Sequence, residues 1–456
     1  MTDPREIIDK SAMTTLQYVI VAITVLLNGM DGFDVLAISV SSRGIQGEFG
    51  IGQEILCYVL SAELVGMAIG SVRLGGVSDK IGRRNMLLGC LVVMAGGMFI
   101  ATTATNLITL GIYRVITGLG IGGMLSTTNA VVAEFSNNKH RGLCISLMVI
   151  GYPLGGIVCG EVGKALLAAD GLNWRVMFMV GGVLSAALIP ITYFLVPESV
   201  HWLARRQPES ALTRINAALS KLGHKIVDAL PAIETAQLKA SVLDIFSPAL
   251  RMTTILVTLA YFTHIVTFYF ILKWTPAIVG EMGFPANLAS GVLTWANVGG
   301  AAGGAVFGLL TSRIGLKPLS IGIVALTGVG VAIYGQTSPD LTMISMLACL
   351  AGFFGNAGVS GLYTIVAYVF PTHLRATGTG FVIGVGRGGA VLAPIMAGYL
   401  LGAFKVEGVV GSGVASVALI MAIGSLLGAI VLTFLKMGTD KPATSPNVAV
   451  GDAKLA

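Results

Sequence analysis

Twelve stretches of roughly twenty apolar residues constrain this chain more than any other feature, because each could cross a bilayer as a helix. They begin near Gln17, Ile55, Met86, Leu107, Leu143, Trp174, Arg251, Leu288, Pro318, Leu341, Ala376 and Gly411. A polar segment separates the first six from the last six. Since backbone groups cannot stay unpaired in lipid, we expect an all-α membrane protein with twelve transmembrane helices in two six-helix halves.

The same pattern predicts the domain boundaries. Residues 1–197 form the first half, 198–250 a cytoplasmic linker, 251–437 the second half and 438–456 a cytoplasmic tail. Only 11% of the 456 residues are charged, yet the linker holds a concentration of them. Its basic residues include Arg205, Arg206, Arg214, Lys221, Lys225 and Lys239. The linker is therefore too polar to cross a membrane.

Lysine and arginine concentrate on alternate loops, which by the positive-inside rule marks the cytoplasmic side. If the N-terminus is cytoplasmic, the outer loops keep only Arg43, Lys164, Arg175, Lys273 and Lys405. Two further arginines, Arg114 and Arg387, fall within spans. We expect a multi-pass protein of the cell inner membrane with both termini in the cytoplasm.

Several classes of partner and activity find no support in the sequence. The net charge is +6, but the basic residues are dispersed and form no stripe that would bind nucleic acid. The five cysteines lack the spacing of a metal site or a disulfide scaffold. No nucleophile with its base and no phosphate-binding loop is evident. We therefore expect a lipid-embedded monomer without enzymatic activity, cofactor or metal.

Two loops carry a recognisable motif. Gly75 to Arg84 reads G-G-V-S-D-K-I-G-R-R and resembles the major facilitator superfamily pattern G-x-L-[AS]-D-[RK]-x-G-[RK]-[RK]. A weaker copy runs from Gly308 to Lys317, with Ser312 in place of the acid. The R-x-x-x-G-x-G that starts at Arg114 is also similar to this superfamily. The resemblance covers the whole hydrophobic chain, and it implies two pseudo-symmetric halves with alternating access to a midplane site.

Two further segments resemble the aromatic acid:proton symporter family within that superfamily. They are D-G-F-D, from Asp31 to Asp34, and P-T-H-L-R-A-T-G-T-G, from Pro371 to Gly380. The resemblance implies proton-coupled import of a small aromatic carboxylic acid of the benzoate or hydroxybenzoate type. The alternatives are a carrier of another small organic acid or a proton-driven exporter of hydrophobic compounds. A central Arg387 would give a cation exporter no advantage.

Four membrane-embedded charges are candidates for proton coupling. Asp31 and Asp34 are spaced i, i+3, which places both carboxyls on one face of the first helix. The resemblance assigns a coupling role to Arg114, with one of these acids as its partner. A purely structural pair between the first and fourth helices is the alternative. Glu63, on the second span, completes the set.

Arg387 is the candidate for binding a substrate carboxylate, because a planar guanidinium can hold a carboxylate with two hydrogen bonds. The glycines around it, Gly384, Gly386, Gly388 and Gly389, should leave room beside it. An ion pair with Glu63 is the alternative role for Arg387. The other substrate-binding candidates are Asp34, Tyr269, Trp295, Asn297 and Tyr363. Most aromatic residues in membrane helices are structural, so each of these competes with a packing role.

The loop motif supplies a candidate conformational gate. Its residues are Gly75, Asp79, Gly82, Arg83 and Arg84, together with Glu134 and Arg375. The resemblance implies that Asp79 caps the inner end of the eleventh helix, where the helix dipole attracts an anion. An ordinary solvated charge cluster is the alternative for Glu134.

Overall fold

The computed structural model describes residues 3–168, 170–231, 242–371, 374–406, 409 and 411–436. Twelve helices in this part are long and apolar enough to cross a membrane. The first half contains α2 (Thr15–Val40), α4 (Gln53–Ile81), α5 (Arg83–Ala101), α6 (Leu107–Phe135), α7 (Arg141–Leu166) and α8 (Arg175–Leu195). The second contains α11 (Arg251–Glu281), α12 (Ala286–Ile314), α13 (Leu316–Gly335), α14 (Leu341–Val369), α15 (Arg375–Ala403) and α16 (Val414–Phe434). The predicted all-α fold is confirmed, and each helix begins within three residues of its expected start.

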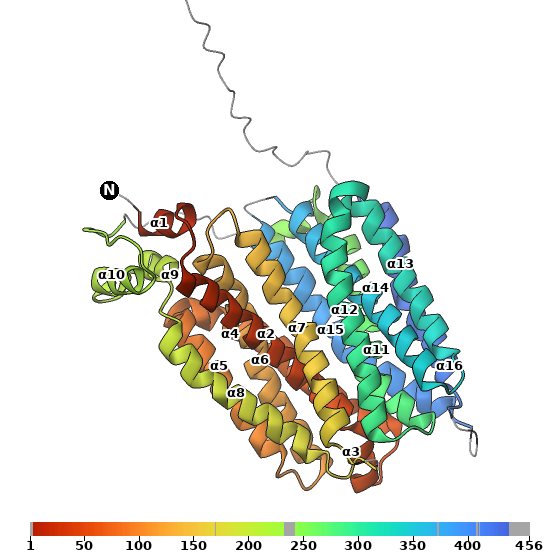
Figure 1. Ribbon diagram of the computed structural model, residues 1–456. Helices are drawn as coiled ribbons and strands as arrows, with labels where there is room; N and C mark the ends of the chain where they lie inside the picture. The colour runs from red at the N-terminus through yellow and green to blue at the C-terminus, as the bar shows by residue number, and fades with distance from the viewer. Residues whose placement is uncertain are drawn as a thin grey trace, which may run out of the picture.

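The shorter elements lie at the ends of the bundle. The helix α1 (Pro4–Lys10) lies near α9 (Val200–Arg206) and α10 (Ala211–Lys221) of the linker, at the end that we call the α1 end (Figure 1). The helix α3 (Ser42–Phe49) lies at the opposite end, the α3 end. The 3-10 helix η1 (Val242–Phe246) leads into α11. The predicted tail, residues 438–456, lies outside the described residues, as do Lys239, Thr372 and His373.

The two halves repeat one packing pattern. In the first half α2 packs on α7, α4 on α6 and α5 on α8; the equivalent pairs in the second are α11 with α15, α12 with α14 and α13 with α16. The halves meet where α4 packs on α15 and α7 on α12. In Figure 1 the first half, coloured red to yellow, therefore lies beside the green-to-blue second half. This repetition confirms the predicted pseudo-symmetry.

A charged contact fixes α3 to the first half. Glu48 accepts hydrogen bonds of 2.7 Å from Nη2 of Arg175 and from the indole N–H of Trp174. The hydrogen bond from Arg175 lowers the pKa of Glu48 below its ordinary value. Glu48 is therefore ionised at neutral pH, and it anchors α3 to the start of α8.

Glycine allows the closest helix contacts. A Cβ atom on Gly118 of α6 would lie 2.1 Å from the carbonyl oxygen of Glu63 on α4, and one on Gly66 would lie 2.2 Å from that of Val115. The equivalent pair in the second half, α12 and α14, meets at Gly299, where a Cβ would lie 1.9 Å from the carbonyl oxygen of Cys349. Lipid supplies no hydrophobic force between helices, so close packing of this kind has to hold them together.

The two motifs, expected in loops, lie almost wholly on helices, and only Gly82 and Gly315 separate one helix from the next. Gly82 has φ +100° between α4 and α5, and Gly315 has φ +87° between α12 and α13. Side chains with a Cβ rarely adopt this region, so glycine allows the sharp turn at both positions. A Cβ on Gly82 would also lie 2.2 Å from a carboxylate oxygen of Glu198. The two turns thus match in geometry although Ser312 replaces the acid in the second motif.

The α4–α6 contact leads to a prediction about stability. We expect Gly118→Ala to destabilise the protein by about 1–3 kcal/mol, because the added methyl group meets rigid backbone. Gly111, on the same helix, has no neighbouring atom within 4 Å of the point where a Cβ would lie, and it serves as the matched control. Thermal unfolding of the purified protein in detergent measures both variants. Equal melting temperatures for Gly118→Ala and Gly111→Ala would contradict this account of the packing.

Candidate functional site

Two buried acids lie on α2 in the first half. Asp31 is 1% exposed and Asp34 is fully buried. Within the described part of the chain, neither pair of carboxyl oxygens has a hydrogen-bond partner. The side chain of Asp34 is directed towards Gly181 on α8. An unpaired ion is costly to bury, so this face of α2 is suited to holding protons.

A second buried cluster is centred on Glu63. One carboxylate oxygen forms an ion pair with Arg114 of α6, and the other lies 3.4 Å from the ammonium group of Lys273 on α11. All three side chains are fully buried. Lys273 also donates to the carbonyl of Val35, while Arg114 donates to the carbonyl of Asp34 at 2.7 Å. This cluster joins three helices of the first half to one of the second.

The cluster differs from the sequence-based expectation in two pairings. The expected partner of Arg114 is the carboxyl of Asp31 or Asp34, but the structure pairs it with Glu63. The alternative pair between Glu63 and Arg387 is not formed, since the Glu63 carboxylate already contacts two other cations. The carboxyl groups of Asp31 and Asp34 therefore form no ion pair with Arg114.

Lys273 corrects the predicted map of the outer loops. The sequence-based assignment places it in a loop, whereas α11 continues through it to Glu281 and buries it completely. The signal that could have revealed this is the apolar stretch Pro276-Ala277-Ile278-Val279, which follows Lys273. An apolar stretch on both sides of a lysine indicates a membrane-embedded charge.

Arg387 lies half-buried on α15. Its guanidinium forms no hydrogen bond or ion pair among the described residues. It is still close enough for its positive charge to act on the carboxyl of Asp31. The flanking glycines divide into two groups. Gly386 and Gly389 let Tyr261 and Phe262 of α11 approach α15, whereas Gly384 borders open space. The predicted room beside Arg387 is thus present on one side of the helix.

Four tyrosines surround this region, and we call them the tyrosine cluster: Tyr152 on α7, Tyr261 and Tyr269 on α11, and Tyr363 on α14. Tyr261 donates its hydroxyl to that of Tyr363 at 3.3 Å, and their ring centroids are 5.6 Å apart. Tyr261 and Tyr269 both lie within electrostatic range of Arg387. Tyr152 lies next to Tyr269. The structure therefore places a cation beside a group of phenol rings.

Two other substrate-binding candidates lie elsewhere. Trp295 is 52% exposed. Asn297, two residues later and on the opposite side of α12, is buried against Gly156 of α7 and donates to the carbonyl of Leu293 at 2.9 Å. Trp295 is not brought into the tyrosine cluster, and Asn297 packs between the two halves. Sequence reasoning also omitted Tyr152, because an isolated tyrosine in an apolar span gives no signal of its own.

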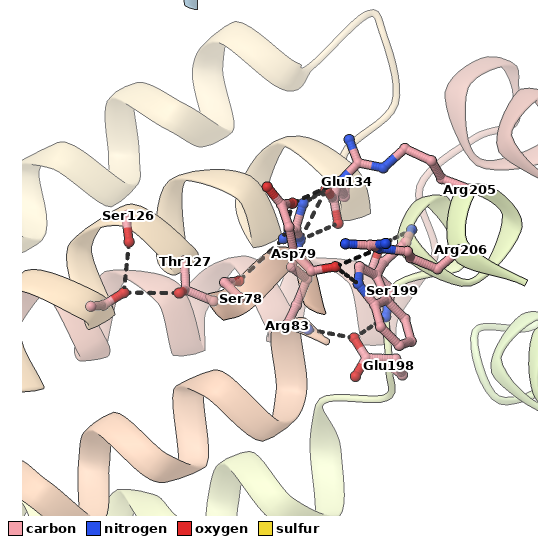
Figure 2. A network of polar contacts seen from close by, with 12 residues as sticks. Ser78, Asp79, Arg83, Ser126, Thr127, Glu134, Glu198, Ser199, Arg205 and Arg206 are labelled. Atoms are coloured by element: carbon pink, nitrogen blue, oxygen red, sulfur yellow. Dashed lines mark hydrogen bonds and ion pairs between the residues drawn. The ribbon is translucent and has the colours of Figure 1, made fainter. Parts of the chain in front are cut away.

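The gate candidates form a polar network at the α1 end (Figure 2). Asp79 accepts hydrogen bonds from Arg83 at 2.8 Å and from Arg205 of the linker helix α9 at 2.7 Å. Arg83 also forms an ion pair of 3.0 Å with Glu134 on α6. Glu134 therefore belongs to a connected network, which reaches from the first half into the linker.

Glu198 extends this network towards the start of α5. It accepts the backbone N–H groups of Arg83 at 2.8 Å and of Ser199 at 2.9 Å. A carboxylate at a helix N-terminus is favourably placed relative to the helix dipole. Arg84 lies over the ring of Tyr193, 4.5 Å from its centroid. Of the other gate candidates, Gly75 faces Ser126 and Arg375 is exposed.

The polar contacts of Asp79 involve only the first half and the linker, within the described chain. The expected cap on the inner end of α15 is therefore not formed in this state. Apart from the buried contacts of Lys273 with Glu63 and Val35, the polar contacts between the halves in the described part of the chain lie towards the α3 end instead. They are Arg43 to the carbonyl of Phe284, Gln53 to Glu281 at 2.7 Å, Tyr58 to Tyr399, and Ser61 to the carbonyl of Val391 at 2.9 Å. The structure is closed at the α3 end.

Comparison with known proteins identifies the fold and its class. The family model described as Major Facilitator Superfamily matches residues 21–300 and 257–455. The chain belongs to this superfamily. It is thus a multi-pass membrane transporter and not an enzyme, as the sequence predicts.

The relatives of this superfamily member include aromatic acid transporters. The gallate transporter of Pseudomonas putida is 28% identical over 405 residues, which cover 88% of this chain and 89% of that protein. The 4-hydroxybenzoate transporter PcaK of the same organism is also 28% identical, covering 88% and 90%. Among solved structures, a D-xylose-proton symporter gives a TM-score of 0.72 at 18% identity, covering 92% of this chain and 97% of that one. The structural match supports the fold alone.

The gate network predicts a kinetic defect. We expect Asp79→Asn to slow transport roughly tenfold, because it removes the charge that pairs with Arg83 and Arg205, while solute affinity changes little. Glu209→Gln is the control, since it removes an exposed acid from the same linker. Equilibrium binding is measured beside the transport rate. A large loss of affinity with normal turnover would show that Asp79 belongs to the binding site.

Proposed function

We propose that this transporter is a proton-coupled symporter that imports a small aromatic carboxylic acid, of the benzoate or hydroxybenzoate type, by alternating access. The names of the relatives support this class of substrate. The observation that carries the proposal is the guanidinium of Arg387, which has no ion-pair partner in the described chain and lies near the tyrosine cluster. A cation of this kind suits an anion and disfavours export of hydrophobic cations.

Each part of the substrate has a matching group in this proposal. The carboxylate binds the planar fork of Arg387 with two charge-assisted hydrogen bonds. The aromatic ring packs against Tyr261, Tyr269 and Tyr363, since aromatic rings attract one another edge-to-face or offset. The phenol hydroxyls, including that of Tyr152, are positioned to meet hydroxyl groups on the ring. Trp295 has no part in this site.

The charges of the two halves suggest how protons are coupled to the substrate. Away from the network at the α1 end, the described part of the first half contributes three buried acids, Asp31, Asp34 and Glu63, and one buried cation, Arg114. The second half contributes two cations: buried Lys273 and half-buried Arg387. Three acids thus balance three cations when all are ionised. An anion that binds Arg387 adds an uncompensated charge, which a proton on nearby Asp31 would cancel. We propose that one proton enters on Asp31 with each monovalent anion.

We propose that the protein lies in the cell inner membrane as a monomer. In the proposed orientation the α1 end and both termini face the cytoplasm. Basic residues gather at this end, where α4 ends and where α5 and α7 begin, and they include Lys80, Arg83, Arg84 and Arg141. Burial of Lys273 removes one basic residue from the opposite loops and strengthens the asymmetry. Closure of the α3 end then corresponds to the state that faces inwards.

Proton coupling predicts a specific pattern of driving forces. In proteoliposomes, an inward proton gradient should drive accumulation of radiolabelled 4-hydroxybenzoate, and an uncoupler should abolish that accumulation. A membrane potential alone should drive none, because one proton and one monovalent anion carry no net charge. Uphill uptake that survives loss of the proton gradient would rule out the coupling. Uptake driven by potential alone would rule out the one-to-one ratio.

Carboxylate recognition predicts a graded series at Arg387. We expect Arg387→Ala to weaken binding of 4-hydroxybenzoate roughly tenfold or more, because a charge-assisted hydrogen bond contributes about 1.5–3 kcal/mol. Arg387→Lys should be intermediate, since it keeps the charge and loses the fork. Isothermal titration of the purified variants measures the affinities.

Arg375→Ala provides the matched control, because this exposed arginine begins the same helix. It should bind with the affinity of the unmodified protein. Equal affinities for Arg387→Ala and Arg375→Ala would mean that the carboxylate is held elsewhere.

A further inference from the structure

Lys273 brings a charge of the second half into the interior of the first. The groups around its ammonium come from four helices of the first half: the carbonyl of Val35 on α2, Glu63 on α4, Arg114 on α6 and Cys159 on α7. The side chain is fully buried. A lysine buried in this way stays in place only while nearby groups compensate its charge.

The compensation available to Lys273 is incomplete. Among the described residues, Glu63 is the one carboxylate in contact with it, at 3.4 Å, and the other oxygen of that carboxylate pairs with Arg114. Two cations therefore share one anion. Arg114 in turn lies within electrostatic range of Asp34, whose backbone carbonyl it also contacts. The charge on Asp34 thus influences how much of the Glu63 charge is left for Lys273.

We propose that Lys273 is the positioning residue through which the charge of Asp34 controls closure of the α3 end. An ionised Asp34 attracts Arg114 and leaves more of the Glu63 charge to hold Lys273. A protonated Asp34 commits Arg114 to Glu63 and loosens Lys273. Lys273 lies about two helical turns before Glu281, which bonds Gln53 across the halves. Loosening Lys273 therefore favours separation of the halves at the α3 end.

This inference deepens the proton coupling of the proposed function and rests on it. Protons that arrive from the α3 side would open that side, and their loss would close it. The carboxyls of Asp31 and Asp34 also repel each other when both are ionised, so the two acids do not titrate independently. The path from Asp34 through Arg114 and Glu63 to Lys273 gives this coupling a physical route between the halves.

The chain contains its own reporter of closure. Cys57 on α4 is fully buried against α15, where a Cβ on Gly398 would lie 2.5 Å from the Cβ of Cys57. Separation of α4 from α15 exposes this thiol to a polar maleimide. The test uses the purified full-length protein in detergent with Cys57 as its single cysteine. The other four are changed as Cys90→Ala, Cys144→Ala, Cys159→Ser and Cys349→Ala.

The experiment is a double-mutant cycle on the rate of Cys57 modification. Asp34→Asn imitates the protonated acid and should raise this rate at least about fivefold, the lower end of typical coupling between sites. In the Lys273→Met background the same change should alter the rate less than about twofold, as independent sites do. The proposal is overturned if Asp34→Asn changes the rate of Cys57 modification equally with Lys273 and with Met at position 273. It is also overturned if Asp34→Asn leaves the rate unchanged in folded protein that retains Lys273.

Two controls separate the relay from general damage. Lys164→Met removes an exposed lysine near the α3 end of α7, paired with Glu161, and should retain the full effect of Asp34→Asn. Lys273→Arg keeps the positive charge, so the effect of Asp34→Asn on the rate should persist in that background too. If Lys273→Met does not fold, Lys273→Gln takes its place. No solute is present in this test. A failed cycle therefore leaves import of an aromatic acid standing, and failed uptake leaves the cycle interpretable.

Discussion

The carboxylate of Glu63 is the interaction on which the rest of the structure depends. It lies fully buried between Arg114 and Lys273, and so it ties α4 to α6 within the first half and to α11 of the second. Removal of Glu63 would leave two fully buried cations without the carboxylate that both of them contact. The close approach of α4 and α6 at Gly118 positions this cluster, because that glycine meets the backbone of Glu63 itself.

The charges are divided unequally between the halves. The acids Asp31, Asp34 and Glu63 all belong to the first half, whereas Lys273 and Arg387 belong to the second. In the proposed mechanism, protons change the charge of one half and the solute anion changes that of the other. Binding and conformational change would then act on the same electrostatic attraction between the halves.

The two ends of the bundle are built differently. At the α1 end, Asp79 and its partners connect the first half with the linker, and several of these groups are partly exposed. At the α3 end, hydrogen bonds such as that between Gln53 and Glu281 cross from one half to the other. If Asp79 caps α15 in another state, it would have to leave Arg205, and the linker helix α9 would then compete with the second half for Asp79.

The sequence by itself determined the fold and part of the site. The bilayer imposes a length and a hydropathy on each span, and these are properties of consecutive residues, so every transmembrane helix begins within three residues of its expected start. The turn at Gly82 and the shared face of Asp31 and Asp34 are equally local, because helix geometry and backbone φ depend on nearby residues.

Only the tertiary structure decided which groups meet. Arg114 pairs with Glu63, Lys273 lies inside the bundle, and Trp295 is half exposed. Each of these outcomes depends on how a helix is rotated about its axis and on which distant helix it crosses. Hydropathy averages over all faces of a helix and contains neither quantity. The identity of charged partners is a property of the packed bundle, where the cost of burying a charge selects among the available pairs.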